Sequence, residues 1–176
     1  MKRFQPKRTG SLRKATAILL AFSLLTLLLT ACGGKSEPKV PVTVDTYIST
    51  VEGLGYAAAD TASNYADFEH IEQCIGFIEG FLDVEFFKFD TSDSALSFFE
   101  NMQETINAKA TGTRSWRVSP RNGKSQTFTE NATDHYYLLS WVEDTLVYAY
   151  CGKTTDKEAL EAAKEEIKKI IEAIGY

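Results

Sequence analysis

The stretch YYLLSWVEDTLVYAYC, residues 136–151, indicates the fold more strongly than any other part of this sequence. Two runs rich in aromatic and β-branched residues, 136–142 and 145–151, are separated only by Glu143 and Asp144. Such runs favour strands over helix, and a two-residue connection favours a tight antiparallel hairpin, although Glu-Asp is not a preferred turn pair. The stretch therefore predicts a β-hairpin within an antiparallel sheet.

The sequence after this hairpin predicts a long amphipathic helix. Thr155 and Glu158 have the spacing of a capping box, and Gly175 stands where a helix commonly ends. The apolar residues between them recur at helical spacing and would form one stripe: Leu160, Ala163, Ile167, Ile170, Ile171 and Ile174. We expect this stripe to pack against the sheet.

Upstream segments add two helices and two more pairs of strands. Helices are expected from Thr43 to Gly53 or Gly55, and from Thr91 or Ser92 to about residue 111. Strands are expected at 76–81 and 84–89, and a second hairpin at 115–118 and 126–129 around Asn122-Gly123. Residues 68–74 fit either a helical turn or the beginning of a strand. The order predicts an α+β fold: a two-layer sandwich, with an antiparallel sheet and about three helices on one face.

The N-terminal segment has the organisation of a secretory signal. Residues 1–14 are basic and lack acids, residues 15–30 form an apolar run, and small side chains then precede Cys32. A run of this length falls short of the roughly 20 residues that span a bilayer. We therefore expect residues 1–31 to be removed and no transmembrane helix to remain.

The last residues of this signal, Leu29, Thr30, Ala31 and Cys32, resemble the lipobox of bacterial lipoproteins. The resemblance covers residues 1–34 and implies that a diacylglyceryl lipid, with fatty acids such as palmitate, is attached to Cys32. It implies an anchor in the cell membrane on the extracytoplasmic side. The Gly, Pro and charged residues that follow Cys32 without periodicity predict a flexible stalk at 32–42, and the length of the remaining chain fits a single globular domain at 43–176. A plain cleavage site with an incidental cysteine, or an uncleaved anchor, are the alternatives.

The other two cysteines, Cys74 and Cys151, form an even pair in an exported domain. A disulfide between them is possible, and two buried free thiols are the competing interpretation.

The sequence offers little catalytic or metal chemistry. Its two histidines, His70 and His135, do not belong to a spaced set of metal ligands, and no phosphate loop or nucleophile motif is present. We expect no metal, no cofactor beyond the covalent lipid, and no enzymatic activity.

Charge excludes one class of partner and suggests a surface for another. Six of the 19 Lys and Arg residues and none of the 24 acids precede Cys32, so cleavage would change the net charge from −5 to −11. An acidic domain repels nucleic acid, so we expect no nucleic-acid partner. Bases without acids recur between residues 105 and 129, and four of them form a candidate anion-contact strip: Arg114, Arg117, Arg121 and Lys124. Pairing of these bases with acids of the same fold, or simple solvation, are the alternatives.

These patterns predict a membrane-anchored, extracytoplasmic lipoprotein that binds a polymer or protein of the cell envelope without catalysis. A carrier of a small apolar or amphipathic ligand is one alternative, because the chain holds 11 Phe and 8 Tyr. An envelope hydrolase is another, and it would require His70 or His135 to lie beside a serine or an acid in a cleft.

Overall fold

The computed structural model describes residues 38–118 and 123–176. The predicted signal segment, the lipobox with Cys32, and Arg121 lie outside these residues. Within the described ranges, no helix has both the length and the apolar character needed to cross a membrane.

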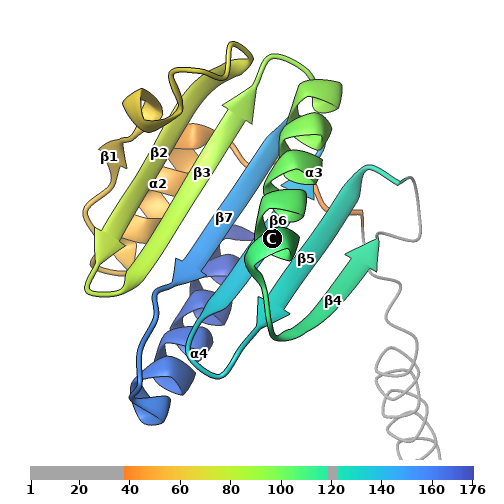
Figure 1. Cartoon of the computed structure of the whole chain (residues 1–176). Coiled ribbons are helices and arrows are strands. Elements are labelled where there is room, and N and C mark those ends of the chain that lie inside the picture. Colours follow the sequence, from red (N-terminus) through yellow and green to blue (C-terminus); the bar gives the residue numbers. More distant parts are fainter. Residues whose placement is uncertain (1–37, 119–122) are drawn as a thin grey trace, which may run out of the picture. The chain divides into compact units, whose positions relative to one another are not determined.

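A seven-stranded sheet organises the described chain, and every pair of neighbouring strands is antiparallel (Figure 1). The order across the sheet is β1-β2-β3-β7-β6-β5-β4. The strands are β1 (Ala59–Asp60), β2 (Ile71–Glu79), β3 (Leu82–Phe89), β4 (Thr113–Val118), β5 (Ser125–Asn131), β6 (Tyr136–Val142) and β7 (Thr145–Cys151). The predicted hairpin at 136–151 is confirmed, and Glu143 in its turn adopts a left-handed conformation with φ of 51°.

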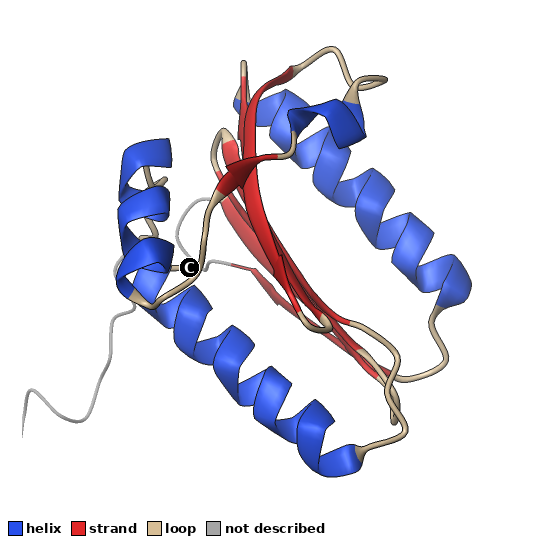
Figure 2. Cartoon of the chain, turned by 90° about the vertical axis from the view of Figure 1, so that its left-hand side faces the viewer, coloured by secondary structure: helices blue, strands red, loops and turns tan. Residues whose placement is uncertain are grey.

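Helices cover both faces of this sheet, as Figure 2 shows. Helices α2 (Val44–Gly53) and α4 (Lys157–Ile174) pack on one face, and α3 (Ser92–Lys109) packs on the other. The predicted α+β class with an antiparallel sheet and three helices is confirmed. The prediction of two layers with all helices on one face is wrong.

The central strands explain the third layer, because they bury both of their faces. In β6, Leu138 and Val142 belong to the core under α2 and α4, whereas Leu139 and Trp141 belong to the core under α3. Strands buried on both faces have near-continuous apolar sequences, and residues 136–142 are of this kind. The core under α3 is rich in aromatic side chains, among them Phe87, Phe89, Phe98, Phe99 and Phe128.

Side-chain hydrogen bonds cap the N-termini of helices α2, α3 and α4. The hydroxyl oxygens of Thr43 and Thr91 accept the backbone N–H groups of Thr46 and Ser94, at 3.2 and 3.1 Å. The predicted capping box of Thr155 and Glu158 is wrong, because α4 begins one residue later. The Asp156 carboxylate accepts the N–H groups of residues 158 and 159, at 3.0 and 3.1 Å, and so satisfies two donors that the first turn leaves without helical partners.

Strand β2 begins at Ile71 and extends the predicted strand toward the N-terminus. Part of the segment that sequence patterns left undecided is thus extended chain. It follows a short 3-10 helix, η1 (Ala62–Tyr65), and a turn that includes Phe68. This arrangement brings residues 67–71 beside the first half of α3.

Candidate functional site

A groove of 580 Å³ lies between residues 67–71 and the N-terminal half of α3. Its size falls within the range of small-molecule sites, roughly 300–1,000 Å³. The lining residues come from the turn before β2, the start of β2, the end of β3 and α3: Asp67, Phe68, Glu69, His70, Ile71, Phe89, Asp93, Ser94, Ser97, Phe98 and Asn101.

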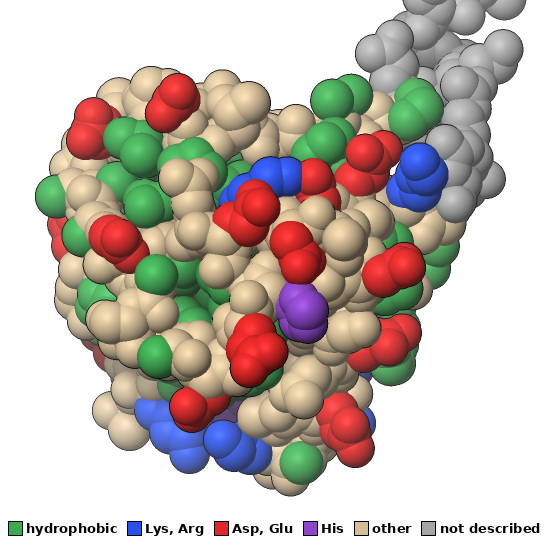
Figure 3. Space-filling model, turned by 90° about the horizontal axis from the view of Figure 1, so that it is seen from above, with side chains coloured by type: hydrophobic (Ala, Val, Ile, Leu, Met, Phe, Trp, Pro, Cys, Tyr) green, Lys and Arg blue, Asp and Glu red, His purple; other side chains and the backbone are tan. Residues whose placement is uncertain are grey.

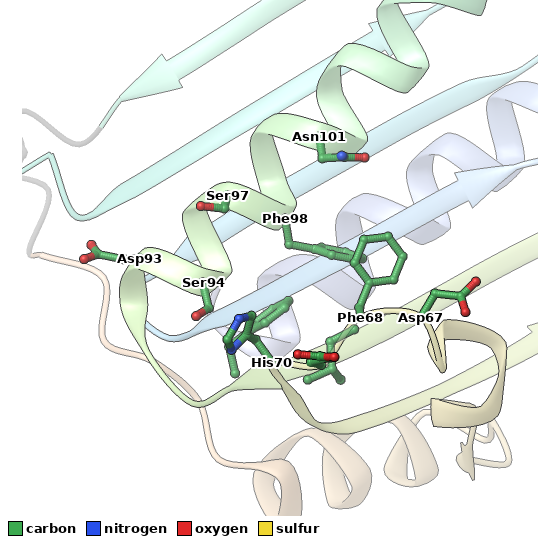
Figure 4. Close-up of a pocket in the computed structure, with 11 residues that line it drawn as sticks. Asp67, Phe68, His70, Asp93, Ser94, Ser97, Phe98 and Asn101 are labelled. Carbon is green, nitrogen blue, oxygen red and sulfur yellow. The ribbon is translucent and has the colours of Figure 1, made fainter.

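Aromatic rings and Ile71 form the apolar part of the groove. The ring of Phe98 meets that of Phe68 edge to face, with 4.9 Å between centroids, and lies 5.3 Å from that of Phe89. Figure 4 shows the Phe68 and Phe98 rings close together at one end of the groove. Phe98 and Phe89 are buried, whereas Phe68 remains 43% exposed, so part of this aromatic surface can meet a ligand.

A hydrogen-bonded pair, His70 and Asp90, stands at the other end. The Nδ1 atom of His70 lies 2.9 Å from a carboxylate oxygen of Asp90, and both side chains are exposed. The Asp90 N–H also donates to the His70 carbonyl oxygen, at 3.2 Å. Hydrogen bonds from Ser94 and then from His70 hold the pKa of Asp90 below its ordinary value. These contacts fix the turn before β2 to the start of α3.

Charge around the groove is of one sign. Asp67, Glu69 and Asp93 line it, Asp90 stands beside it, and none of its lining residues is Lys or Arg. Figure 3 shows Asp and Glu side chains around the exposed histidine on this side of the molecule. In Figure 4 the Asp93 carboxylate points away from the groove, so this acid contributes to the rim. The site combines an apolar aromatic floor with an acidic rim.

Two serines in the groove bear on the hydrolase alternative. Ser94 and Ser97 share the groove with His70, so the required neighbourhood of histidine, acid and serine exists. Among the described hydrogen bonds, however, none joins His70 to either serine, and the Ser94 hydroxyl is 2.7 Å from that of Thr91. A serine nucleophile requires contact with its base, and this arrangement does not supply it.

His135 belongs to a buried polar cluster, away from the groove, on the face of the sheet that α3 covers. Its Nε2 atom lies 3.0 Å from Glu130 and its Nδ1 atom lies 2.7 Å from Asp134, so the neighbouring Asp134 does contact this ring. No group of three or more His, Cys, Asp or Glu suited to a metal ion occurs in the part of the chain that the structure describes.

The possible disulfide between Cys74 and Cys151 is not formed. Both thiols are free and buried, and they belong to cores on opposite faces of the sheet. Strand β3 separates their strands, and the pairing registers offset them by five residues, which places them about 15–20 Å apart. A disulfide needs Cα atoms within about 7 Å. The alternative of two buried thiols is the correct one.

The predicted anion-contact strip is not a single surface. Arg114 and Arg117 are three residues apart on β4, so their side chains point to opposite faces of the sheet. The Arg114 guanidinium donates to the Asn107 and Ala110 carbonyl oxygens at the end of α3, at 3.3 and 3.0 Å. Lys124 lies 3.9 Å from Glu143, and Arg121 lies outside the described residues.

The residues of the groove were not predicted as a site. Their sequence signal is the excess of acids between residues 45 and 104, where 13 acids accompany one base, Lys88. That excess could have indicated a cation-facing surface. Nothing in the sequence indicated that Phe68 and Phe98 would line a site, because aromatic residues usually belong to the hydrophobic core.

Comparison with known proteins does not assign the chain to a family. No protein-family model matches it, and no curated protein matches it. Solved structures that are similar in part include the following two. A GTP-binding regulator of Thermotoga maritima is 15% identical, with a TM-score of 0.43, over 76% of this chain and 87% of that one. The extracellular domain of PknH from Mycobacterium tuberculosis is 13% identical, with a TM-score of 0.33, over 74% of this chain and 92% of that one. Similarity this low carries no inference about function.

Proposed function

We propose that the chain is a lipid-anchored, extracytoplasmic binding protein whose groove takes a small organic cation with an apolar or aromatic part. One observation carries the choice of ligand: an aromatic floor lies within an acidic rim, and none of the residues that line the groove is Lys or Arg. A cation over an aromatic ring gains about 0.5–2 kcal/mol, depending on how far it is desolvated. The carboxylates of the rim attract the positive charge of such a ligand and repel anions.

The anchoring part of the proposal is supported by the order of basic, apolar and small residues that ends at Cys32. Two acyl chains would hold the domain stably at a membrane, because each buried methylene contributes about 0.8 kcal/mol. Growth of the source cells with an alkyne-tagged palmitate should label the wild-type chain and a Cys151→Ala control. The Cys32→Ser variant should not be labelled, and labelling of that variant would overturn the anchor.

The ligand part is tested by calorimetric titration of the full chain in detergent. Benzyltrimethylammonium is the cationic probe, and phenylacetate is an anion of similar size. The cation should bind at a single site and more weakly as salt is added. Phe68→Ser, and Asp67→Asn with Glu69→Gln, should each weaken binding by about tenfold. Glu104→Gln, an exposed acid of α3 outside the groove, should leave binding unchanged. Equal binding of the anion, or an equal loss in the control, would overturn the cation site.

The carrier alternative uses the same groove with an amphipathic cation as its natural ligand. Native mass spectrometry of the chain purified from its source separates the two possibilities. A co-purified amphiphile that benzyltrimethylammonium displaces would favour the carrier, and an empty chain that binds the probe would favour a reversible binding protein.

A hydrolase is the second candidate: the groove holds the His70–Asp90 pair and two serines, and His70 would have to come into contact with one of the serine hydroxyls when substrate binds. A fluorophosphonate probe would then label the native chain at Ser94 or Ser97, and His70→Gln would abolish the labelling. Absence of labelling in the wild-type chain, with a serine hydrolase as the positive control, would exclude this candidate.

A further inference from the structure

A second surface lies on the α3 face of the sheet, at the end where β3 begins and β7 ends. Residues that pair across neighbouring strands point to the same face, so the registers define a row across the sheet. This row is Ile78, Asp83, Tyr150, Tyr137, Glu130 and Arg114. Glu85 and Tyr148 belong to the next row toward the core under α3.

Three tyrosines make this surface aromatic and partly accessible. The rings of Tyr137 and Tyr150 stack with 4.5 Å between centroids, and the ring of Tyr148 lies 6.4 Å from that of Tyr137. All three are only partly buried, and Ile78 at the edge of the row is 72% exposed. Tyrosines with one accessible side are common anchors of protein interfaces, because they bring large contact area at little entropy cost.

Two carboxylates accompany these rings without a base. Glu85 is buried and is bonded by the Tyr65 hydroxyl. Asp83, two residues away on the same face, has one buried oxygen that lacks a hydrogen-bond partner within the described chain. Burial, and then repulsion by Glu85, raise the pKa of Asp83 to about 6. The one basic residue of the row, Arg114, stands at its far end and donates to α3 carbonyls. A cation supplied from outside would compensate the charge of Asp83.

We propose that the surface formed by Ile78, Asp83, Tyr137, Tyr148 and Tyr150 binds a protein segment that presents an arginine or lysine side chain. Charge complementarity and the half-buried rings fit a guanidinium or ammonium group, which can pair with Asp83 and lie over a tyrosine ring. A partly exposed row of a sheet offers contacts to an extended polypeptide, in contrast to the concave groove at His70. The proposal is independent of the function assigned to that groove.

Peptide selection on the full chain in detergent tests this proposal. The probes are a pool of random nonapeptides with a central arginine and a matched pool with central citrulline, which keeps the shape without the charge. The immobilised chain should retain the arginine pool at least about tenfold more strongly. Asp83→Asn and Tyr150→Ser should remove the difference, and circular dichroism should show both variants folded. Glu104→Gln, an exposed acid of α3 outside both surfaces, is the control and should preserve the difference. Asp67→Asn reports whether the groove at His70 holds the arginine instead.

Three outcomes would overturn the proposal. They are equal retention of the two pools, a preference that survives Asp83→Asn, and a preference that Asp67→Asn removes. Competition with arginine amide shows whether the ligand is a protein segment or a small cation. If the free amide displaced the selected peptides at the peptides' own concentration, the surface would bind a small cation and not a protein segment.

Discussion

The Nε2 atom of His135 lies 3.0 Å from a carboxylate oxygen of Glu130, and neither side chain is more than 8% exposed. The contact lacks the alignment of a hydrogen bond, so this oxygen of Glu130 has no hydrogen-bond partner among the described residues. The other oxygen of Glu130 accepts the N–H of Gly112, at 2.8 Å, just after the end of α3. Glu130 thus joins three segments, namely β5, the start of β6 and the connection from α3 to β4.

Replacement of Glu130 should therefore be costly. Glu130→Ala is expected to lower the free energy of unfolding by about 1–3 kcal/mol, because it leaves the Gly112 N–H without its acceptor and removes the buried contact with the His135 ring. Glu130→Gln keeps an acceptor for Gly112 and should lose less than the alanine variant. Urea denaturation measures the free energy of unfolding of both variants. A loss below about 1 kcal/mol in Glu130→Ala would show that the cluster contributes little to stability.

A methyl group at Gly112 has no room in the native structure. A Cβ atom there would lie 2.3 Å from the Asn131 carbonyl oxygen and 2.4 Å from Glu130. Gly112→Ala should destabilise the fold by more than about 2 kcal/mol, since either the β4–β5 pairing or the Glu130 contact must shift. The matched control is Gly53→Ala in α2, where no atom lies within 4 Å. It should be neutral or stabilising by up to about 1 kcal/mol in the same thermal unfolding assay.

Asp83 should make stability depend on pH. Burial is the main cause that raises its pKa from 3.8 to about 6. The folded state therefore binds the proton more tightly than the unfolded state, and stability is lost as pH rises from about 4 to about 6. Asp83→Asn should be more stable than wild type by about 1–2 kcal/mol near pH 7, and this gain should disappear near pH 4.

Urea midpoints of Asp83→Asn at the two pH values check this expectation. Gly53→Ala changes no titratable group and provides the comparison, so its difference in stability from wild type should be the same at both pH values. An Asp83→Asn variant that is less stable near pH 7, or equally stabilised at both pH values, would contradict the assigned cause.

The thiols of Cys74 and Cys151 should be present as free thiols and protected in the native state. Burial raises the pKa of Cys74 to about 12, so little thiolate forms near pH 8. Iodoacetamide should modify both residues quickly in denaturant without reductant, and slowly in the native protein. Peptide mapping by mass spectrometry distinguishes the sites. Resistance of both cysteines in denaturant until reductant is added would show a disulfide and contradict the structure.

Local patterns were sufficient for most elements of the fold. The stripe of α4 and the two apolar runs of the β6–β7 hairpin are periodic over many residues, so each predicted its element without knowledge of its neighbours. The cap of α4 was misassigned by one residue. Thr155 and Asp156 are both good capping residues, and only the path of the chain before α4 selects between them.

The face that each helix covers could not be taken from such patterns. Residues 136–142 are apolar on both sides, which is compatible with a third layer. That α2 and α4 cover one face and α3 covers the other was decided only by the complete packing of the sheet. The same alternation of strand side chains separated Cys74 from Cys151 and Arg114 from Arg117. The even number of cysteines had suggested the first pair, and the local excess of bases had grouped the second.

The sequence by itself determined the signal-like N-terminus, the acidic character of the remaining chain, and the type of most helices and strands, because these depend on neighbouring residues along the chain. Only the tertiary structure decided which distant side chains meet. The groove joins Phe68 to Phe98, and the tyrosine surface joins Asp83 to Tyr150 across β3 and β7. Such contacts depend on strand order and register, which the packing of the whole sheet sets at once, and no local stretch encodes them.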